Sequence, residues 1–140
     1  MLNLKKIILK YFTVIFALIF IAGLQVTAAQ GTVVDVISES EDHSIFSELL
    51  AETQLDQVIA QPGPFTVLAP TNDAFEAMGT ELDQIRTNPD RMQNIVIGHL
   101  FQGEVSSEDV IATLEVNIEE GDIPATNGIV HVTDEVIMGQ

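Results

Sequence analysis

The histidines are the first residues to consider for chemistry, because the sequence contains no cysteine. Nucleophilic catalysis needs a Ser, Thr or Cys held by a base and an orienting acid, and no Gly-x-Ser-x-Gly motif occurs. The histidine bases available are His43, His99 and His131. His43 stands among acidic residues at an expected helix start, which predicts a solvated side chain. His99 and His131 lie between apolar neighbours, which favours buried, hydrogen-bonded rings over catalytic ones.

Metal and carbohydrate sites find little support in the residue spacing. Zinc takes three or four ligands in close register, and neither His-x-His nor His-x-x-x-His is present. His99 and His131 would form a weak metal or small-ligand site only if their strands were adjacent, and this alternative stays open. The run Glu119-Glu120-Gly121-Asp122 is more typical of a solvated turn than of a calcium site. The chain has no Trp and a single Tyr, at position 11, so stacking platforms for sugars are missing. We expect a non-enzymatic protein without a metal or cofactor.

Residues 1–29 resemble a secretory signal peptide. Three lysines at positions 5, 6 and 10 precede or open an uncharged run of 12 residues, and small residues follow at 26–29. A basic region, an apolar region and a small-residue cleavage site are the parts of such a signal. We place the cut after Ala28 or Ala29, which leaves residues 30–140 as a single domain. The alternative is an uncleaved anchor, although 12 helical residues would span only about 18 Å of a ~30 Å hydrocarbon core.

The remaining chain is strongly acidic. Cleavage would leave two basic residues, Arg86 and Arg91, against all 21 acidic residues, a net charge of −19. Such a charge excludes nucleic acid as a partner, and an anionic membrane surface could be approached only through an uncleaved N-terminal segment. Without cysteine, an exported protein of this size must be stabilised by its core alone. The expected location is secreted, periplasmic or at the cell surface.

Apolar periodicity and capping residues predict helices mainly in the first half. Thr32 caps a helix to Ile37, and Asp42 or Ser44 caps a second helix that runs to about Leu50. Phe65–Ala69 is a buried strand that Pro70 ends, and Thr71 caps the helix that follows. Further helices are expected over 74–78, around 82–85, after Asn88-Pro89, and after a capping box formed by Ser106 and Asp109.

Strands are expected mainly in the second half. Alternation predicts strands over 97–102, 114–119 and 129–138, with turns at 120–122 and 124–128, where Asn127-Gly128 is a strong hairpin signal. Interleaved helices and strands indicate a mixed α/β or α+β domain.

Two stretches resemble a known family. Phe65-Thr66-Val67-Leu68-Ala69-Pro70-Thr71-Asn72-Asp73-Ala74-Phe75 is similar to the first signature box of the fasciclin-like adhesion domains. Asn127-Gly128-Ile129-Val130-His131-Val132-Thr133-Asp134 is similar to their second box. Between the boxes, Gly98-His99-Leu100 falls where that family carries a Tyr-His pair, and Asp122-Ile123 matches its Asp-Ile.

This resemblance implies helices packed on a wedge-like β-sandwich, shortened by one or two strands between Ile111 and Asp122. It also implies a secreted or surface-exposed, non-catalytic adhesion module that binds a cell-surface or matrix protein or glycan. The family's partner-binding residues would correspond to Asp122, Ile123 and His99, and we add Asn127 of the same loop. Gly98 in place of the tyrosine removes an aromatic ring from that surface.

Overall fold

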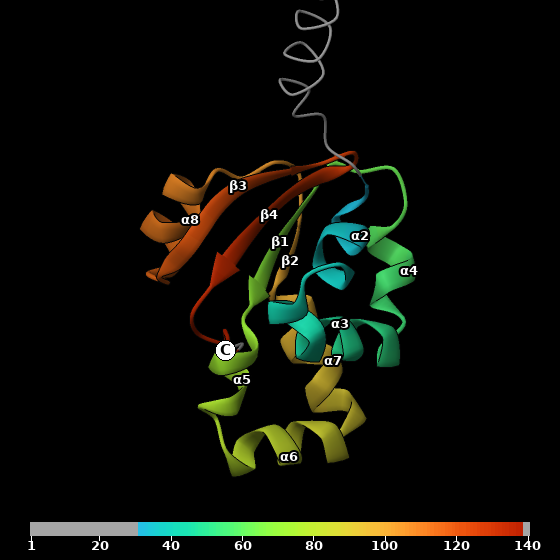
Figure 1. Cartoon of the computed structure of the whole chain (residues 1–140), viewed down its shortest axis with the longest axis vertical. Helices are drawn as coiled ribbons and strands as arrows, with labels where there is room; N and C mark the ends of the chain where they lie inside the picture. Colours follow the sequence, from blue (N-terminus) through green and yellow to red (C-terminus); the bar gives the residue numbers. More distant parts are fainter. Residues whose placement is uncertain (1–30, 139–140) are drawn as a thin grey trace, which may run out of the picture.

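The computed structural model describes residues 31–138. The elements of this part follow one another as α2 (Val33–Ser38), the 3₁₀ turn η1 (Glu41–His43), α3 (Ser44–Glu52), α4 (Leu55–Ile59), β1 (Phe65–Pro70), α5 (Asn72–Glu76), α6 (Thr80–Thr87), α7 (Pro89–Gly98), β2 (Leu100–Gln102), α8 (Ser107–Leu114), β3 (Ile118–Ala125) and β4 (Gly128–Thr133) (Figure 1). The expected signal peptide lies outside the described residues. No helix within 31–138 is long and apolar enough to cross a membrane.

The strands of the described part form one four-stranded mixed sheet in the order β2-β1-β4-β3. β1 pairs in parallel with β4 and antiparallel with β2, while β3 and β4 form an antiparallel hairpin. In Figure 1, β1 and β4 run through the middle of the sheet, with α2, α3, α4 and α7 on one side and α8 beyond β3. The expected mixed α/β class is confirmed. The strands between residues 31 and 138 make a single sheet, however, and not two sheets packed as a sandwich.

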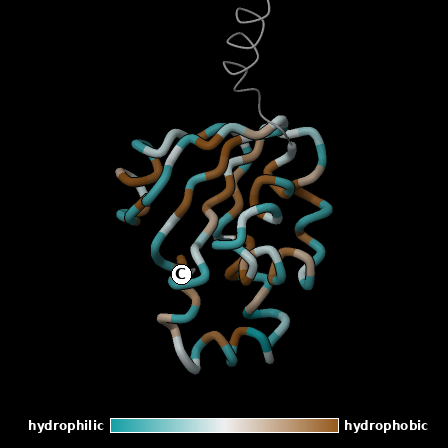
Figure 2. Tube along the Cα trace, viewed as in Figure 1, coloured by the Kyte–Doolittle hydropathy of each residue, from teal (hydrophilic) through white to brown (hydrophobic). Residues whose placement is uncertain are grey.

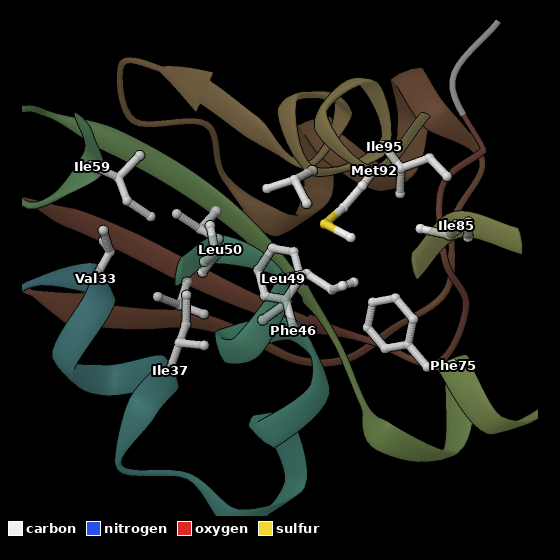
Figure 3. Close-up of a cluster of buried hydrophobic side chains, with 14 residues drawn as sticks. Val33, Ile37, Phe46, Leu49, Leu50, Ile59, Phe75, Ile85, Met92 and Ile95 are labelled. Carbon is white, nitrogen blue, oxygen red and sulfur yellow. The ribbon is translucent and has the colours of Figure 1, made fainter. Parts of the chain in front are cut away.

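The central strand β1 divides the interior into two clusters. Val67 and Ala69 point into the main core, which helices α2, α3, α5, α6 and α7 complete, while Leu68 packs on the opposite face with Val110 and Val116. Figure 3 shows side chains of the main core meeting between helices and sheet, and Figure 2 shows brown, apolar stretches along the central strands. Alternate side chains of a strand point to opposite faces, so β1 is covered by apolar side chains on both sides.

Most of the predicted helix starts are confirmed by hydrogen bonds. Asp35 completes a capping box with the N-cap Thr32. The other caps each accept a backbone N–H bond, namely Thr71 from Ala74, Asn88 from Arg91 and Ser106 from Asp109. The cap of the second helix was predicted wrongly. Neither Asp42 nor Ser44 occupies that position, because η1 runs directly into α3. The capping hydrogen bond comes instead from Asn72, the first residue of α5, whose Oδ1 accepts from the Ile45 N–H at 3.0 Å.

Several strand boundaries also differ from the prediction. Residues 97 and 98 belong to α7, so β2 begins only at Leu100. Leu114 ends α8, and Glu115 closes that helix with φ 56°. The turn expected at 120–122 is a bulged part of β3, and β4 ends at Thr133. Short apolar alternation did not separate a helix end from a strand in these places, because three or four residues fit both periods.

Candidate functional site

The β3–β4 hairpin carries three of the four residues predicted to bind a partner. Its turn is fixed by Asn127, whose Oδ1 accepts from the Val33 N–H at 2.9 Å. The Asn127 amide donates to the carbonyls of Ile59 at 2.7 Å and Gln61 at 2.9 Å. A Cβ atom at Gly128 would collide with the backbone of Phe65. The Asn-Gly pair therefore holds the hairpin against α2, α4 and the start of β1.

Asp122 lies in the bulge of β3 with φ 58° and is exposed. Its carboxylate accepts from the Oγ of Ser107 at 2.7 Å and from the Ser107 N–H at 3.2 Å. These two hydrogen bonds, the side-chain one first, hold the pKa of Asp122 below its usual value of 3.8. The Asp122 N–H donates to Nδ1 of His131 at 2.8 Å. Asp122 therefore offers a partner only the remaining lone pairs of a carboxylate that already holds the first turn of α8.

Ile123 is half-buried and packs at the edge of the main core. It faces Val130 across the hairpin, and both line a cleft of about 360 Å³. The far wall of this cleft consists of α2 and η1, and Thr71 lines it at the end of β1. Of the predicted partner-binding residues, Ile123 alone lines the cleft.

His99 differs from the other three because its side chain is fully buried. It caps the C-terminus of α7, where Nδ1 donates to the Ile95 carbonyl at 2.7 Å and Nε2 accepts from the Ile137 N–H at 3.0 Å. Burial lowers the pKa of His99 to about 4, although the bond to Ile95 acts in the opposite direction. The ring also packs on Phe46, with centroids 5.7 Å apart. A role of His99 in partner binding stays a prediction. Because the ring is buried, that role could only be to position other groups.

The two remaining histidines are buried as well. His131 is fully buried, with Nε2 donating to the Val105 carbonyl at 2.7 Å. His43 is only 5% exposed, and its Nδ1 donates to the Pro70 carbonyl at 3.1 Å. The expectation of a solvated His43 was therefore wrong, because η1 turns its ring inward against the end of β1. Both nitrogens of His99 and of His131 are occupied by the backbone, which leaves neither ring free to bind a metal or small ligand in this conformation.

Sequence reasoning missed the grouping of charged side chains around the cleft. Asp42 of η1 and Glu119 and Glu120 of β3 line it together with His43. The sequence predicts a turn over 119–122, whereas these residues belong to the bulged edge strand β3, where Glu119 and Glu120 lie across the cleft from η1. Within residues 31–138, no group of three or more His, Asp or Glu side chains is arranged to hold a metal ion.

A comparison with family models decides the family. The model described as the Fasciclin domain matches residues 41–120. The chain belongs to the fasciclin domain family. Protein sll1483 of Synechocystis sp. is 30% identical over 131 residues, which cover 76% of this chain and 73% of that protein. Human periostin is 29% identical over 134 residues. The transforming growth factor-beta-induced protein ig-h3 of Sus scrofa is 28% identical over 145 residues.

The fasciclin domain makes up only part of the larger relatives. The match covers 16% of periostin and 21% of ig-h3. A solved structure of a FAS1 domain pair from the insect cell adhesion molecule Fasciclin I matches 78% of this chain and 51% of its own length. Its TM-score is 0.67 at 13% identity, which establishes a shared fold.

The fold explains why two distant sequence boxes occur together in this fasciclin domain. The first box forms β1 and α5, and the second forms the hairpin turn and β4. The two strands are parallel neighbours in register from Phe65 opposite Gly128 to Pro70 opposite Thr133. Both boxes are therefore structural, and they place the hairpin and the cleft beside α2 and η1.

Proposed function

We propose that this fasciclin domain is an exported, non-catalytic interaction module that binds a protein or glycan of a cell surface or extracellular matrix. The observation that carries the proposal is the family match, supported by a shared fold with a domain pair from an insect cell adhesion molecule. The histidines add support, because His99 and His131 use both ring nitrogens to hold the backbone.

The binding surface in this proposal is the β3–β4 hairpin with the adjoining cleft. Asp122 and Ile123 would contact the partner, since Asp122 is exposed and Ile123 lines the cleft. Asn127 and His99 would position that surface, Asn127 through its bonds to Val33 and to the α4–β1 loop. The more exposed residues are thus assigned to contact with the partner, and the residues held by buried hydrogen bonds are assigned to positioning the surface.

The proposal is tested by binding of the protein to whole cells and to an array of matrix proteins and glycans. We expect binding to specific partners that persists when the salt concentration is raised. Salt screening weakens a general attraction to an acidic surface much more than it weakens binding in a site of complementary shape. Loss of all binding at high salt, or no binding at low salt, would contradict the proposal.

A further inference from the structure

The cleft beside the hairpin combines an apolar floor with an acidic rim. We call it the acidic cleft and define it by Val130 and Ile123 on the floor and by Asp42, His43, Glu119 and Glu120 around them. Glu120 faces Val132 across the hairpin, so its side chain leaves the sheet on the cleft side. The volume of about 360 Å³ lies at the small end of the range of ligand pockets, roughly 300–1,000 Å³. A cleft of this size fits an extended side chain better than a large ligand.

The carboxylates of the rim have no cation of their own in the described part of the chain. The arginines there are Arg86 and Arg91, and both form ion pairs elsewhere, with Glu48 at 3.2 Å and with Glu81 at 2.8 Å. Neither Asp42, Glu119 nor Glu120 forms an ion pair among residues 31–138. Uncompensated like charges around one cleft repel each other, so a cation at this position would be favoured.

His43 supplies an independent indication of a ligand. Its ring is 5% exposed and lines the cleft. Because Nδ1 donates to the Pro70 carbonyl, the proton lies on Nδ1 and Nε2 is a hydrogen-bond acceptor. No described residue donates to Nε2. Among the described residues, Asp56 Oδ1 is the one side-chain nitrogen or oxygen that is both shielded from water and without a hydrogen-bond partner. Nε2 of His43 also lacks a described partner but is not such an atom, so it remains accessible to solvent. A buried ring that leaves one accepting nitrogen accessible suits an N–H donor entering the cleft.

We propose that the acidic cleft binds the side chain of a lysine or arginine presented by a partner protein. The apolar stem would lie on Val130 and Ile123, and the cationic group would face Glu119 and Glu120 while donating to Nε2 of His43. This inference rests on the proposed function and names the chemistry of its partner. A second copy of the chain is disfavoured as the occupant, because each carries 21 acidic residues against 5 basic ones. A bare metal ion lacks the required group of ligands in the described residues.

The test is a titration of the ¹⁵N-labelled protein, followed by NMR, with short peptides of Gly and Ser that carry one central residue. The central residue is lysine, norleucine or acetyl-lysine, and 1,5-diaminopentane serves as the free amine. We expect the lysine peptide to shift the amide signals of Val36, His43 and Ile123 at 0.15 M salt. The norleucine and acetyl-lysine peptides should leave them unchanged. Diaminopentane, the free-amine alternative, should bind no more tightly than the lysine peptide.

Charge variants separate the cleft from the general acidity of the protein. The double variant Glu119→Gln/Glu120→Gln should weaken lysine-peptide binding roughly fivefold, as two exposed ion pairs would. The matched control Glu52→Gln/Glu108→Gln removes the same charge from exposed positions outside the cleft and should weaken binding less than twofold. The inference would be overturned if both double variants lost the same affinity, or if the norleucine peptide shifted the amide signals as much as the lysine peptide. It would also be overturned if diaminopentane bound more tightly than the lysine peptide, or if the lysine peptide caused no shift. Binding to cells that survives Glu119→Gln/Glu120→Gln would overturn it while leaving the proposed function intact.

Discussion

The N–H of Asp122 donates to Nδ1 of His131 across the bulge of the β3–β4 hairpin. The same ring donates from Nε2 to the Val105 carbonyl, and the Asp122 carboxylate accepts two bonds from Ser107. A fully buried histidine thus joins the bulge, β4 and the segment before α8. Asp122, which we propose to contact the partner, therefore also holds the bulge and the first turn of α8, and any binding variant must take this into account.

Replacing His131 by leucine should lower the free energy of unfolding by roughly 1–3 kcal/mol, because the Asp122 N–H and the Val105 carbonyl lose their partners. Urea unfolding followed by circular dichroism measures the loss. His131→Asn keeps one donor and one acceptor and should lose less than His131→Leu. A leucine variant as stable as the wild type would show that the bulge does not need this ring.

Replacing Asp122 separates the carboxylate from the backbone conformation. Asp122→Gly removes the bonds to Ser107 but tolerates φ 58°, whereas Asp122→Ala removes the bonds and is strained there. The alanine variant should therefore unfold more easily than the glycine variant, by roughly 0.5–1 kcal/mol. Thermal and urea unfolding give the difference. An alanine variant equal to or more stable than the glycine variant would contradict the bulge geometry.

Replacing Asn127 by alanine should cost roughly 2–3 kcal/mol, because the Val33 N–H and two carbonyls lose their bonds. Thr126→Ala is the matched control. Thr126 is exposed, and among residues 31–138 its one hydrogen bond is donated by the backbone N–H to the Gly31 carbonyl. The change should therefore stay within about 0.5 kcal/mol. Equal effects of the two substitutions in urea unfolding would disprove the anchoring role of Asn127.

Stability should fall as the pH is lowered from about 6.5 toward 4. The pKa of His99 drops from 6.5 in the unfolded chain to about 4 in the fold because burial disfavours the charged ring. The unfolded state therefore binds more protons across this window, and the contribution of the neutral ring, full above pH 6.5, is lost progressively. The total loss is roughly 3 kcal/mol at 1.36 kcal/mol per pKa unit.

Urea unfolding at several pH values measures this dependence, and His99→Gln provides the control. The variant should be less stable at pH 7, because Ile95 and Ile137 lose a well-placed partner, and its pH dependence between 6.5 and 5 should be flatter. NMR of the wild-type imidazole should show a neutral ring with its proton on Nδ1 at pH 6. A wild-type stability that rises as the pH falls through this window would contradict the account.

Much of the fold could be predicted from local sequence. Pro70-Thr71 ends β1 and caps α5, Asn88-Pro89 opens α7, and Asn127-Gly128 makes the hairpin turn, all through interactions within a few residues. The strands predicted over 97–102 and 114–119 began too early, since α7 continues to Gly98 and α8 to Leu114. The bulge at Asp122 could not be foreseen, because it depends on His131 and Ser107, which bond it from other elements.

The candidate site was only partly predictable for the same reason. The family resemblance pointed to Asp122, Ile123, Asn127 and His99, whereas the acidic cleft joins residues that are far apart in sequence. His43 and Glu120 approach it from η1 and β3. No periodicity links them, and the sequence even favoured a solvated His43. Parallel pairing of β1 with β4, a non-local contact, is what brings the two halves of the cleft together.

The most direct test of the central claim is the affinity of the domain for a partner identified on the cell and matrix array. Wild-type protein, Ile123→Ser and the control Val58→Ser are compared. Ile123 lines the cleft, while Val58 is a 54% exposed apolar residue on α4. We predict at least a tenfold loss for Ile123→Ser in the folded fraction and less than twofold for Val58→Ser. Unchanged affinity of a folded Ile123→Ser variant would contradict the claim that the hairpin and its cleft form the binding surface.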